Sequence, residues 1–495
     1  MALYKTPGVY IEEIATFPPA VAAVETAIPA FIGYTEKAIN EKGESLSKIP
    51  TKITSLLEYE ALFGRCPKQT ISVDVKQTLI SDSNTITQTS VSFAGTPPAI
   101  PDYLLYYSMQ IFFANGGGAC YIMSIGDTTS TSYNKDDFIN AFSVLEEFDE
   151  PTLYVFPDAC SHRASNTADD SSVGDIIDAA LNSCAKMQDR FTIADVRDAL
   201  PGATDTNAEV TTNFRGEILS DKDIVKYGAA YFPYLRTSLS FLSDDDSIEV
   251  ASHTVTSIAS DGSNSDAAGS ISADTSISDG SVRDSQTEVY NAIKAFIRTN
   301  AKVTLPPSAA IAGVYARVDA SRGVFKSPAN VSLAMVDKPA ITITNSINDG
   351  LNVDAGTGKS VNAIRAFAGK GTLVWGARTL AGNDNEWRYV SVRRFFNFVE
   401  ESVKKATAGF VFEPNDANTW TRAKSMVANF LTLQWRAGAL AGAKPEDAFF
   451  VRVGLNQTMS ADDILNGYMI IEIGMAVVRP AEFIVLKFSH KMQES

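Results

Sequence analysis

The first residues of the chain show an alternation that is typical of a β-strand. Val9 and Ile11 lie on one side of an extended chain and Tyr10 and Glu12 on the other, because successive side chains of a strand point to opposite faces. Nothing close in sequence offers a second strand for pairing. The pattern alone leaves two interpretations of equal weight. Residues 9–14 are either a strand without a local partner, or a frayed terminus or edge strand of their own domain.

Helical and strand-like patterns alternate over most of the chain up to residue 364. Three glycines at 116–118 separate an apolar helical segment from the next strand, which suits a helix stop followed by a tight turn. Such alternation predicts an α/β fold, in the broader sense of α+β, with several domains. The expected helices are 103–115, 136–148, 173–189 and 287–300, and the expected strands are 27–35, 119–125, 152–156 and 191–196.

Two polar stretches interrupt this alternation. Residues 40–101 are rich in Thr and Ser, and residues 243–285 hold 13 Ser and 8 Asp in 43 positions with scarcely an aromatic residue. Such segments cannot offset the entropy cost of ordering by burial unless they form short hairpins. We expect an inserted or peripheral region at 40–101 and a surface excursion at 243–285.

The last 130 residues begin with an amphipathic helix at 386–406. Apolar side chains recur at three- and four-residue intervals along one face, whereas Arg393, Arg394, Lys404 and Lys405 lie off that stripe. The pattern predicts one buried face and one basic, exposed face. The stripe consists of Tyr389, Val392, Phe396, Val399 and Val403.

Another helix, a short capped helix and two strands are expected to close the chain. A second amphipathic helix is expected at 417–440, and Ser460 with Asp463 has the spacing of a capping box. The strands are expected at 468–478 and 482–490. In the last strand, Phe483, Val485 and Lys487 alternate with Ile484, Leu486 and Phe488.

Composition and charge narrow the class of protein. The 495 residues, 45% hydrophobic and 20% charged, fit a globular protein with roughly two to four domains. A net charge of −16 argues against nucleic acid as a partner. Residues 365–495 hold 16 Lys and Arg and 13 Asp and Glu, a net charge of +3. The first 364 residues hold 26 Lys and Arg and 45 Asp and Glu, a net charge of −19. One end is therefore mildly basic and the rest strongly acidic.

Neither a secretory signal nor a membrane span is expected. Residues 1–13 carry Pro7, Gly8 and two carboxylates where a signal peptide needs an apolar core. The apolar stretch at 468–478 is interrupted by Glu472 and falls short of the roughly 20 residues of a membrane span. We therefore expect synthesis in the cytoplasm and no direct membrane insertion.

No catalytic or metal-binding constellation stands out. The four cysteines and three histidines are scattered and form no C-x-x-C pattern. The loop at 356–360 resembles the end of a phosphate-binding loop around Lys359, but Val353 replaces the first glycine. Ser402 and Lys405 match Ser-x-x-Lys without its companion motifs. We expect no cofactor, no metal and no enzymatic activity.

Several motifs follow one another in an order that resembles a known family. They lie at 4–13 (YKTPGVYIEE), 112–118 (FFANGGG), 312–319 with 323–330, 369–371 with 375–379, 389–394, and 410–420. In this order they resemble the contractile tail sheath proteins of phages, R-type tailocins and extracellular contractile injection systems. The stretches 40–101 and 243–285 match nothing in that family.

The resemblance implies a structural subunit of a contractile sheath. Such subunits form a homo-oligomer of hexameric rings, stacked helically around an inner tube protein, with baseplate and terminator or cap proteins as further partners. Release from a metastable extended state, without bound nucleotide, would drive the tube through a target envelope. The implied domains are an N-terminal arm at 1–25, an outer domain at 26–364 with insertions near 40–101 and 243–285, and an inner domain at 365–495.

The resemblance also assigns roles to the two ends of the chain. An arm and a C-terminal strand of one subunit would complete a sheet in a neighbour through β-augmentation. Arg393, Arg394, Lys404 and Lys405 would form weak, releasable ion pairs with the tube, and a solvated helix face is the alternative. The intersubunit strands would comprise Val9, Tyr10, Ile11, Glu12, Glu13 and Ile14, and Phe483, Ile484, Val485, Leu486, Lys487 and Phe488.

Two other classes of protein stay open. A non-contractile secreted or surface protein could bind ligands through the Ser- and Asp-rich stretch, and it would stay monomeric at high concentration. A nucleotide-driven motor would hydrolyse ATP and depend on Lys359. A sheath subunit would instead be made in the bacterial cytoplasm and assembled into a phage tail or tail-like particle.

Overall fold

The structure is a computed structural model that describes residues 21–486 except 82, 84, 97, 130–132, 161–171 and 198–206. The chain divides into two compact units. The larger unit is Glu25–Phe395, and the smaller unit combines Met1–Val24 with Phe396–Ser495. The mixed α/β architecture expected from the sequence is confirmed.

A nine-stranded sheet forms the centre of the larger unit, in the order β14-β17-β16-β8-β7-β6-β1-β5-β2. The strands from β16 to β5 run parallel, while β14, β17 and β2 join antiparallel at the two edges. All seven residues of β1 are buried, as expected for a parallel strand covered on both faces. The bounds are β1 Pro29–Thr35, β2 Thr51–Ile53, β5 Cys120–Asp127, β6 Leu153–Val155, β7 Phe191–Asp195, β8 Gly228–Phe232, β14 Val331–Ser332, β16 Val361–Phe367 and β17 Gly371–Val374.

The alternation of side chains in β1 separates two layers of helices. Phe31 belongs to one apolar cluster with helices α2 and α10, and Ala30 and Ile32 belong to another with α3 and α5. Helices α2 and α10 approach closely at Gly313, which has no side chain. A Cβ atom at this position would lie only 2.6 Å from the carbonyl oxygen of Phe112. The bounds are α2 Leu105–Ala114, α3 Lys135–Leu145, α5 Ser172–Met187 and α10 Ser308–Arg322.

Two buried carboxylates at the ends of neighbouring strands hold the first turns of α2 and α10. Asp158 accepts hydrogen bonds from the backbone N–H groups of Leu104 and Leu105 at 2.5 and 3.1 Å. Asp195 accepts from the N–H and the hydroxyl of Ser308 at 2.8 and 2.5 Å. Each carboxylate satisfies N–H groups that a helix start leaves without an intrahelical partner.

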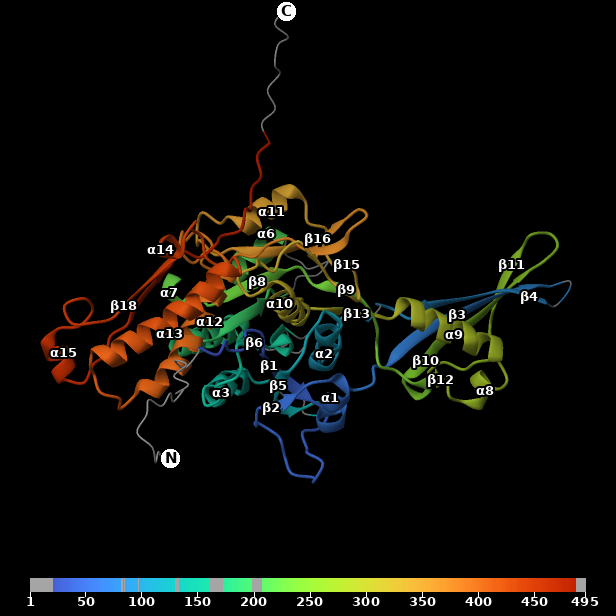
Figure 1. The fold of residues 1–495 in the computed structure, drawn as a ribbon. Helices are drawn as coiled ribbons and strands as arrows, with labels where there is room; N and C mark the ends of the chain where they lie inside the picture. Colours follow the sequence, from blue (N-terminus) through green and yellow to red (C-terminus); the bar gives the residue numbers. More distant parts are fainter. Residues whose placement is uncertain are drawn as a thin grey trace, which may run out of the picture. The chain divides into compact units, whose positions relative to one another are not determined.

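Parts of the two polar stretches, residues 71–93 and 248–276, fold together into a second sheet, which we call the insertion sheet, whereas β2 of the first stretch joins the central sheet. At its centre β3 and β10 run parallel over ten paired positions, and β4, β11 and β12 pair antiparallel beside them (Figure 1). Helix α9 covers one face with Val289, Ile293 and Ile297 buried. The bounds are β3 Ile71–Ile80, β4 Thr85–Phe93, β10 Ile248–Ile258, β11 Asn264–Ala268, β12 Thr275–Ser276, α8 Gly280–Arg283 and α9 Thr287–Asn300.

The expectation of a surface excursion at 243–285 is therefore wrong for its first part. Strand β10 lies in the middle of the insertion sheet, and Ile248 and Val250 are buried. A few apolar residues suffice because β3 supplies the backbone partner from the other polar stretch. The sequence could not show this pairing, since the two strands lie far apart along the chain.

The remaining elements of the larger unit include a three-stranded sheet, in the order β13-β9-β15. Among the described residues, no helix combines the length and apolar character that crossing a membrane requires. The bounds are β9 Leu235–Ser240, β13 Lys302–Leu305, β15 Val336–Pro339, α1 Leu56–Phe63, α6 Asn207–Glu217, α7 Lys222–Val225 and α11 Asn345–Asn352, with 3₁₀ turns η1 Pro157–Cys160 and η2 Asp245–Ser247.

The smaller unit holds most of helix α12, helices α13 to α15 and a two-stranded antiparallel sheet of β18 and β19. The capping box is confirmed, because the Ser460 hydroxyl accepts from the N–H of Asp463 and the Asp463 carboxylate accepts from the N–H of Ser460. The strand expected at 468–478 is shorter than predicted and covers only β19. The bounds are α12 Val390–Thr407, η3 Ala408–Phe410, α13 Ala417–Arg436, α14 Pro445–Ala448, α15 Ala461–Leu465, β18 Phe449–Arg452 and β19 Glu472–Met475.

Candidate assembly interface

The C-terminal segment is extended and presents apolar side chains to solvent. Phe483, Ile484, Val485 and Leu486 are 72–80% exposed. No strand forms in the described part of the expected strand, residues 482–486. Lys487 and Phe488 lie outside the described residues, as do the N-terminal candidates at 9–14. Four consecutive large apolar side chains in solvent are unusual for a folded chain and mark an interaction site.

The small sheet of the same unit has room for further strands. Strands β18 and β19 pair from Phe449 with Met475 to Arg452 with Glu472. Among the described residues, no third strand joins this sheet. A two-stranded sheet has two open edges, and an open edge presents unpaired backbone N–H and C=O groups to an incoming chain.

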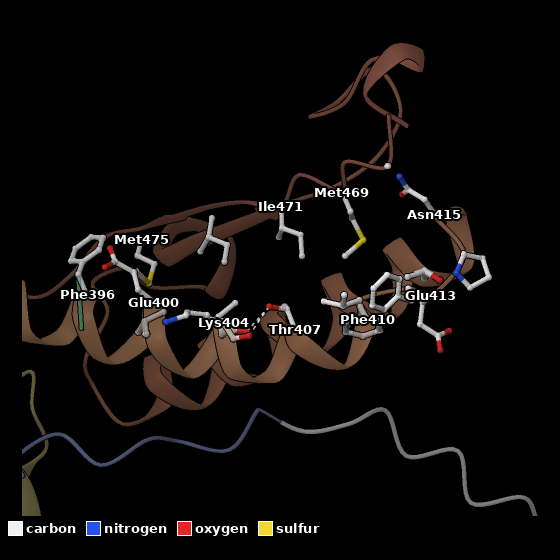
Figure 2. A pocket seen from close by; sticks show the side chains of 18 residues that line it. Phe396, Glu400, Lys404, Thr407, Phe410, Glu413, Asn415, Met469, Ile471 and Met475 are labelled. Carbon is white, nitrogen blue, oxygen red and sulfur yellow. Dashed lines mark hydrogen bonds between the residues drawn. The ribbon is translucent and has the colours of Figure 1, made fainter. Parts of the chain in front are cut away.

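An apolar groove of about 920 Å³ runs beside this sheet. On one side, Met469, Ile471, Ile473 and Met475 follow the two-residue period of an extended chain. Figure 2 shows Met469 and Ile471 pointing across the groove toward Phe410 and Thr407. The helical wall comprises Phe396, Val399, Glu400, Val403, Lys404 and Thr407 of α12, and the turn after it contributes Phe410, Val411, Phe412, Glu413, Pro414 and Asn415.

The two lysines near the end of α12 remain accessible. The side chains of Lys404 and Lys405 are 66% and 40% exposed, and their Nζ atoms lie 3.0 and 3.5 Å from the carboxylate oxygens of Glu401. The carboxylate that they share is buried, since the Glu401 side chain is only 8% exposed, so the two ammonium groups together compensate a buried charge. Their contact with a tube stays a prediction.

The two arginines of the same helix lie in the larger unit and are buried, so the prediction that both are exposed on a basic face is wrong. Arg394 donates to both carboxylate oxygens of Asp319, at 2.6 and 3.1 Å. The guanidinium of Arg393 lies 4.3 Å from the ring centre of Trp387 and 4.9 Å from that of Tyr227. Both cations are satisfied inside the chain, so we withdraw them as candidate tube contacts.

In the loop that resembles a phosphate-binding loop, the lysine binds backbone carbonyl groups of the chain itself. The ammonium group of Lys359 donates to the carbonyl oxygens of Arg215 and Ile218 at the end of helix α6. Burial lowers the pKa of this lysine. The loop therefore ties a helix end to the start of β16, as expected for a structural loop.

The sequence reasoning missed the groove and the role of the turn at 410–415. The turn falls within one of the motifs that resemble the sheath family, but no contact was assigned to it. A local signal existed, because Phe410, Val411 and Phe412 are three consecutive apolar residues just before Pro414, beyond the predicted helix.

Part of the chain is similar in sequence to tail sheath proteins of phages. Residues 382–491 match the family model for the phage tail sheath C-terminal domain. The tail sheath proteins of Vibrio phage KVP40 and Enterobacteria phage T4 are each 27% identical, over 131 and 130 residues. These matches cover 26% of this chain and 19% of each relative, about a fifth of the relatives' length.

Solved structures match over nearly the whole chain. The sheath complex of an extracellular contractile injection system, PVC, in its contracted state is 27% identical with a TM-score of 0.62, over 99% of each chain. The chain is thus similar to tail sheath proteins, in structure over nearly its whole length and in the family model over residues 382–491. The helical sheath of the anti-feeding prophage in its contracted state is 29% identical with a TM-score of 0.60, over 99% of this chain and 100% of that one.

Proposed function

We propose that the protein is the structural subunit of a contractile sheath, which polymerises as stacked rings and contracts around an inner tube. The observation that carries this proposal is the full-length likeness to two sheaths whose structures were determined in the contracted state, at 27% and 29% identity. The role is mechanical, and the energy for contraction is stored in the assembled sheath rather than supplied by a nucleotide.

Subunits join through strand exchange at the smaller unit. The C-terminal segment of one copy adds to the open sheet of β18 and β19 in another, and its backbone groups pair with the sheet edge. The exposure of Phe483, Ile484, Val485 and Leu486 supports this proposal, because each such side chain contributes roughly 1.5–3 kcal/mol when fully buried. The N-terminal arm at 9–14 makes the corresponding contact from the other end of the chain.

The further partners are an inner tube protein, a baseplate and a terminator or cap protein. Lys404 and Lys405 are the candidate tube contacts, since both side chains are accessible. Weak ion pairs suit a contact that must release when the sheath contracts. The subunit is made in the bacterial cytoplasm and acts as a component of a phage tail or tail-like particle.

Electron microscopy of the purified protein tests the proposal. We expect hollow helical tubes at high protein concentration, and a variant that lacks residues 481–495 should remain folded and form none. The described part of the deleted segment, residues 481–486, is exposed and forms no helix or strand, so circular dichroism of the variant should be unchanged. A full-length protein that stays monomeric at high concentration would contradict the proposal and favour a surface ligand-binding protein.

A further inference from the structure

One aromatic side chain of the smaller unit stands in solvent on a strained backbone. Phe412 is fully exposed, at 102%, and its φ angle is +69°. A non-glycine residue with this φ is uncommon, and the cost is larger for a bulky side chain. Neither the exposed ring nor the strained backbone stabilises the chain by itself. Strain of this kind persists at sites where it serves a function.

The turn that carries Phe412 is braced from several directions. The indole N–H of Trp420 donates to the side-chain oxygen of Asn415 at 2.7 Å, and the Asn415 amide donates to the carbonyl oxygen of Tyr468 at 2.9 Å. Asp416 caps α13 by accepting from two N–H groups at 3.0 Å each. The ring is therefore presented by a fixed turn rather than by a free loop, which lowers the entropy cost of binding.

Phe412 also belongs to the lining of the apolar groove, together with Phe410 and Val411. The facing wall presents the side chains of Met469, Ile471, Ile473 and Met475 at two-residue spacing. An extended segment fits such a wall because its own side chains alternate with the same period.

The described residues offer one segment with the matching chemistry. Residues 483–486 are extended, uncharged, apolar and exposed. Four extended residues span about 13 Å, and the seven residues 469–475 span about 23 Å, so the segment is shorter than the wall it would follow. We propose that Phe412 is the anchor that closes over residues 483–486 of a second copy and holds them in the groove. The inference rests on the proposed strand exchange and adds the residue that fixes the incoming segment.

Cysteine cross-linking between two variants tests the contact. One variant carries Phe412→Cys, and the other carries a cysteine in place of one of the residues 483–486, tested in turn. The four native cysteines are buried, so they do not compete. Each chain has a single new thiol, and a disulfide between the two variants therefore reports a contact between copies.

We expect the mixed tubes to yield a cross-linked dimer of both variants on mild oxidation. Leu433→Cys is the matched control, because Leu433 is 59% exposed on α13 and does not line the groove. Tubes in which Phe412→Cys cross-links no better than Leu433→Cys would overturn the inference and leave the proposed function intact. A wild-type protein that forms no tubes would overturn both.

A chain that carries both cysteines distinguishes the two possible sources of the segment. A cross-link that forms within the monomer would assign the groove to the chain's own C-terminal segment and overturn the proposal. We expect the doubly substituted monomer to stay reduced at low concentration and to cross-link only after assembly.

Substitutions at Phe412 separate anchoring from folding. Phe412→Ala should raise the concentration needed for assembly at least tenfold and leave the melting temperature of the monomer unchanged. Phe412→Gly relieves the backbone strain and should stabilise the monomer while still impairing assembly, and Phe412→Tyr should assemble normally. Equal assembly of Phe412→Ala and Leu433→Ala would contradict the anchor.

Discussion

The insertion sheet and the C-terminal segment 483–486 differ in where their strands find partners. In the insertion sheet, β10 pairs with β3 over ten positions, and Ile248 and Val250 are buried. In the C-terminal segment, four consecutive apolar residues are at least 72% exposed, and no strand forms in residues 481–486. The more polar of the two regions is the one that is ordered within the chain.

This difference shows that composition does not decide which segment is a stable strand. A backbone partner satisfies the N–H and C=O groups of a strand, and a few buried apolar residues then suffice. Conversely, an apolar segment without a partner in its own chain remains exposed until another chain supplies one. The strands of the insertion sheet pair within the chain, whereas a partner for residues 483–486 from another copy is our proposal.

The largest expected change in the free energy of unfolding comes from a comparison of two isoleucines, one in each region. Ile293→Ala in helix α9 removes a side chain that is fully buried over the insertion sheet, and we expect a loss of about 2–5 kcal/mol in the free energy of unfolding. Ile484→Ala removes a side chain that is 80% exposed and should leave the stability of the monomer unchanged. Urea denaturation measures both variants. A large loss with Ile484→Ala would show that the segment packs within its own chain.

A smaller loss of stability is expected when acid protonates a histidine of the insertion sheet. Nε2 of His253 lies 3.0 Å from Oε1 of Gln77, and Nδ1 accepts the N–H of Ile271 at 3.2 Å. Burial lowers the pKa of His253 from its ordinary 6.5, because the interior disfavours the charged imidazolium. The unfolded chain therefore takes up a proton before the folded chain does, and stability falls as the pH drops below 6.5.

Denaturation of wild type and His253→Gln at pH 7.5 and 5.5 measures this effect. We expect the difference in stability between the two pH values to be larger for the wild type, because the variant lacks the titrating group. Residues 483–486 should be unaffected, since none of the four is a histidine. An equal difference in both proteins would remove His253 as the cause.

The smallest effect on the monomer is expected at the two accessible lysines. Lys404→Ala and Lys405→Ala, each made alone, should change the free energy of unfolding by less than about 1 kcal/mol, because the other ammonium group still pairs with the buried Glu401 carboxylate. Co-assembly with the tube protein should weaken at low salt, and its dependence on salt should decrease. Lys424→Ala on α13, another exposed lysine, is the matched control. Co-sedimentation that is unchanged relative to this control would remove both lysines from the tube contact.

Elements with a strong local pattern were predictable from the sequence. Helix α9 begins and ends as expected, β1 falls within the predicted strand, and the capping box of Ser460 and Asp463 forms. In each case the signal lies within a few consecutive residues, because side-chain period and cap geometry are local properties.

Features that depend on distant partners were not predictable. The sequence does not show that β3 pairs with β10, nor that Asp319 and Trp387 bind the two arginines of α12. The candidate interface was predicted only in part. Alternation predicted only a strand at 482–490, and the family resemblance made residues 483–488 candidates for an intersubunit contact. The groove and Phe412 depend on a turn whose position relative to the strand wall only the structure supplies.

The central claim is that residues 483–486 find their backbone partner in another copy of the chain. Hydrogen exchange measured by mass spectrometry, on the monomer and on assembled tubes, tests it most directly. The account predicts fast exchange of these amides in the monomer and strong protection in the tubes, while the amides of β10 are protected in both. Tubes in which residues 483–486 exchange as fast as in the monomer would contradict the account.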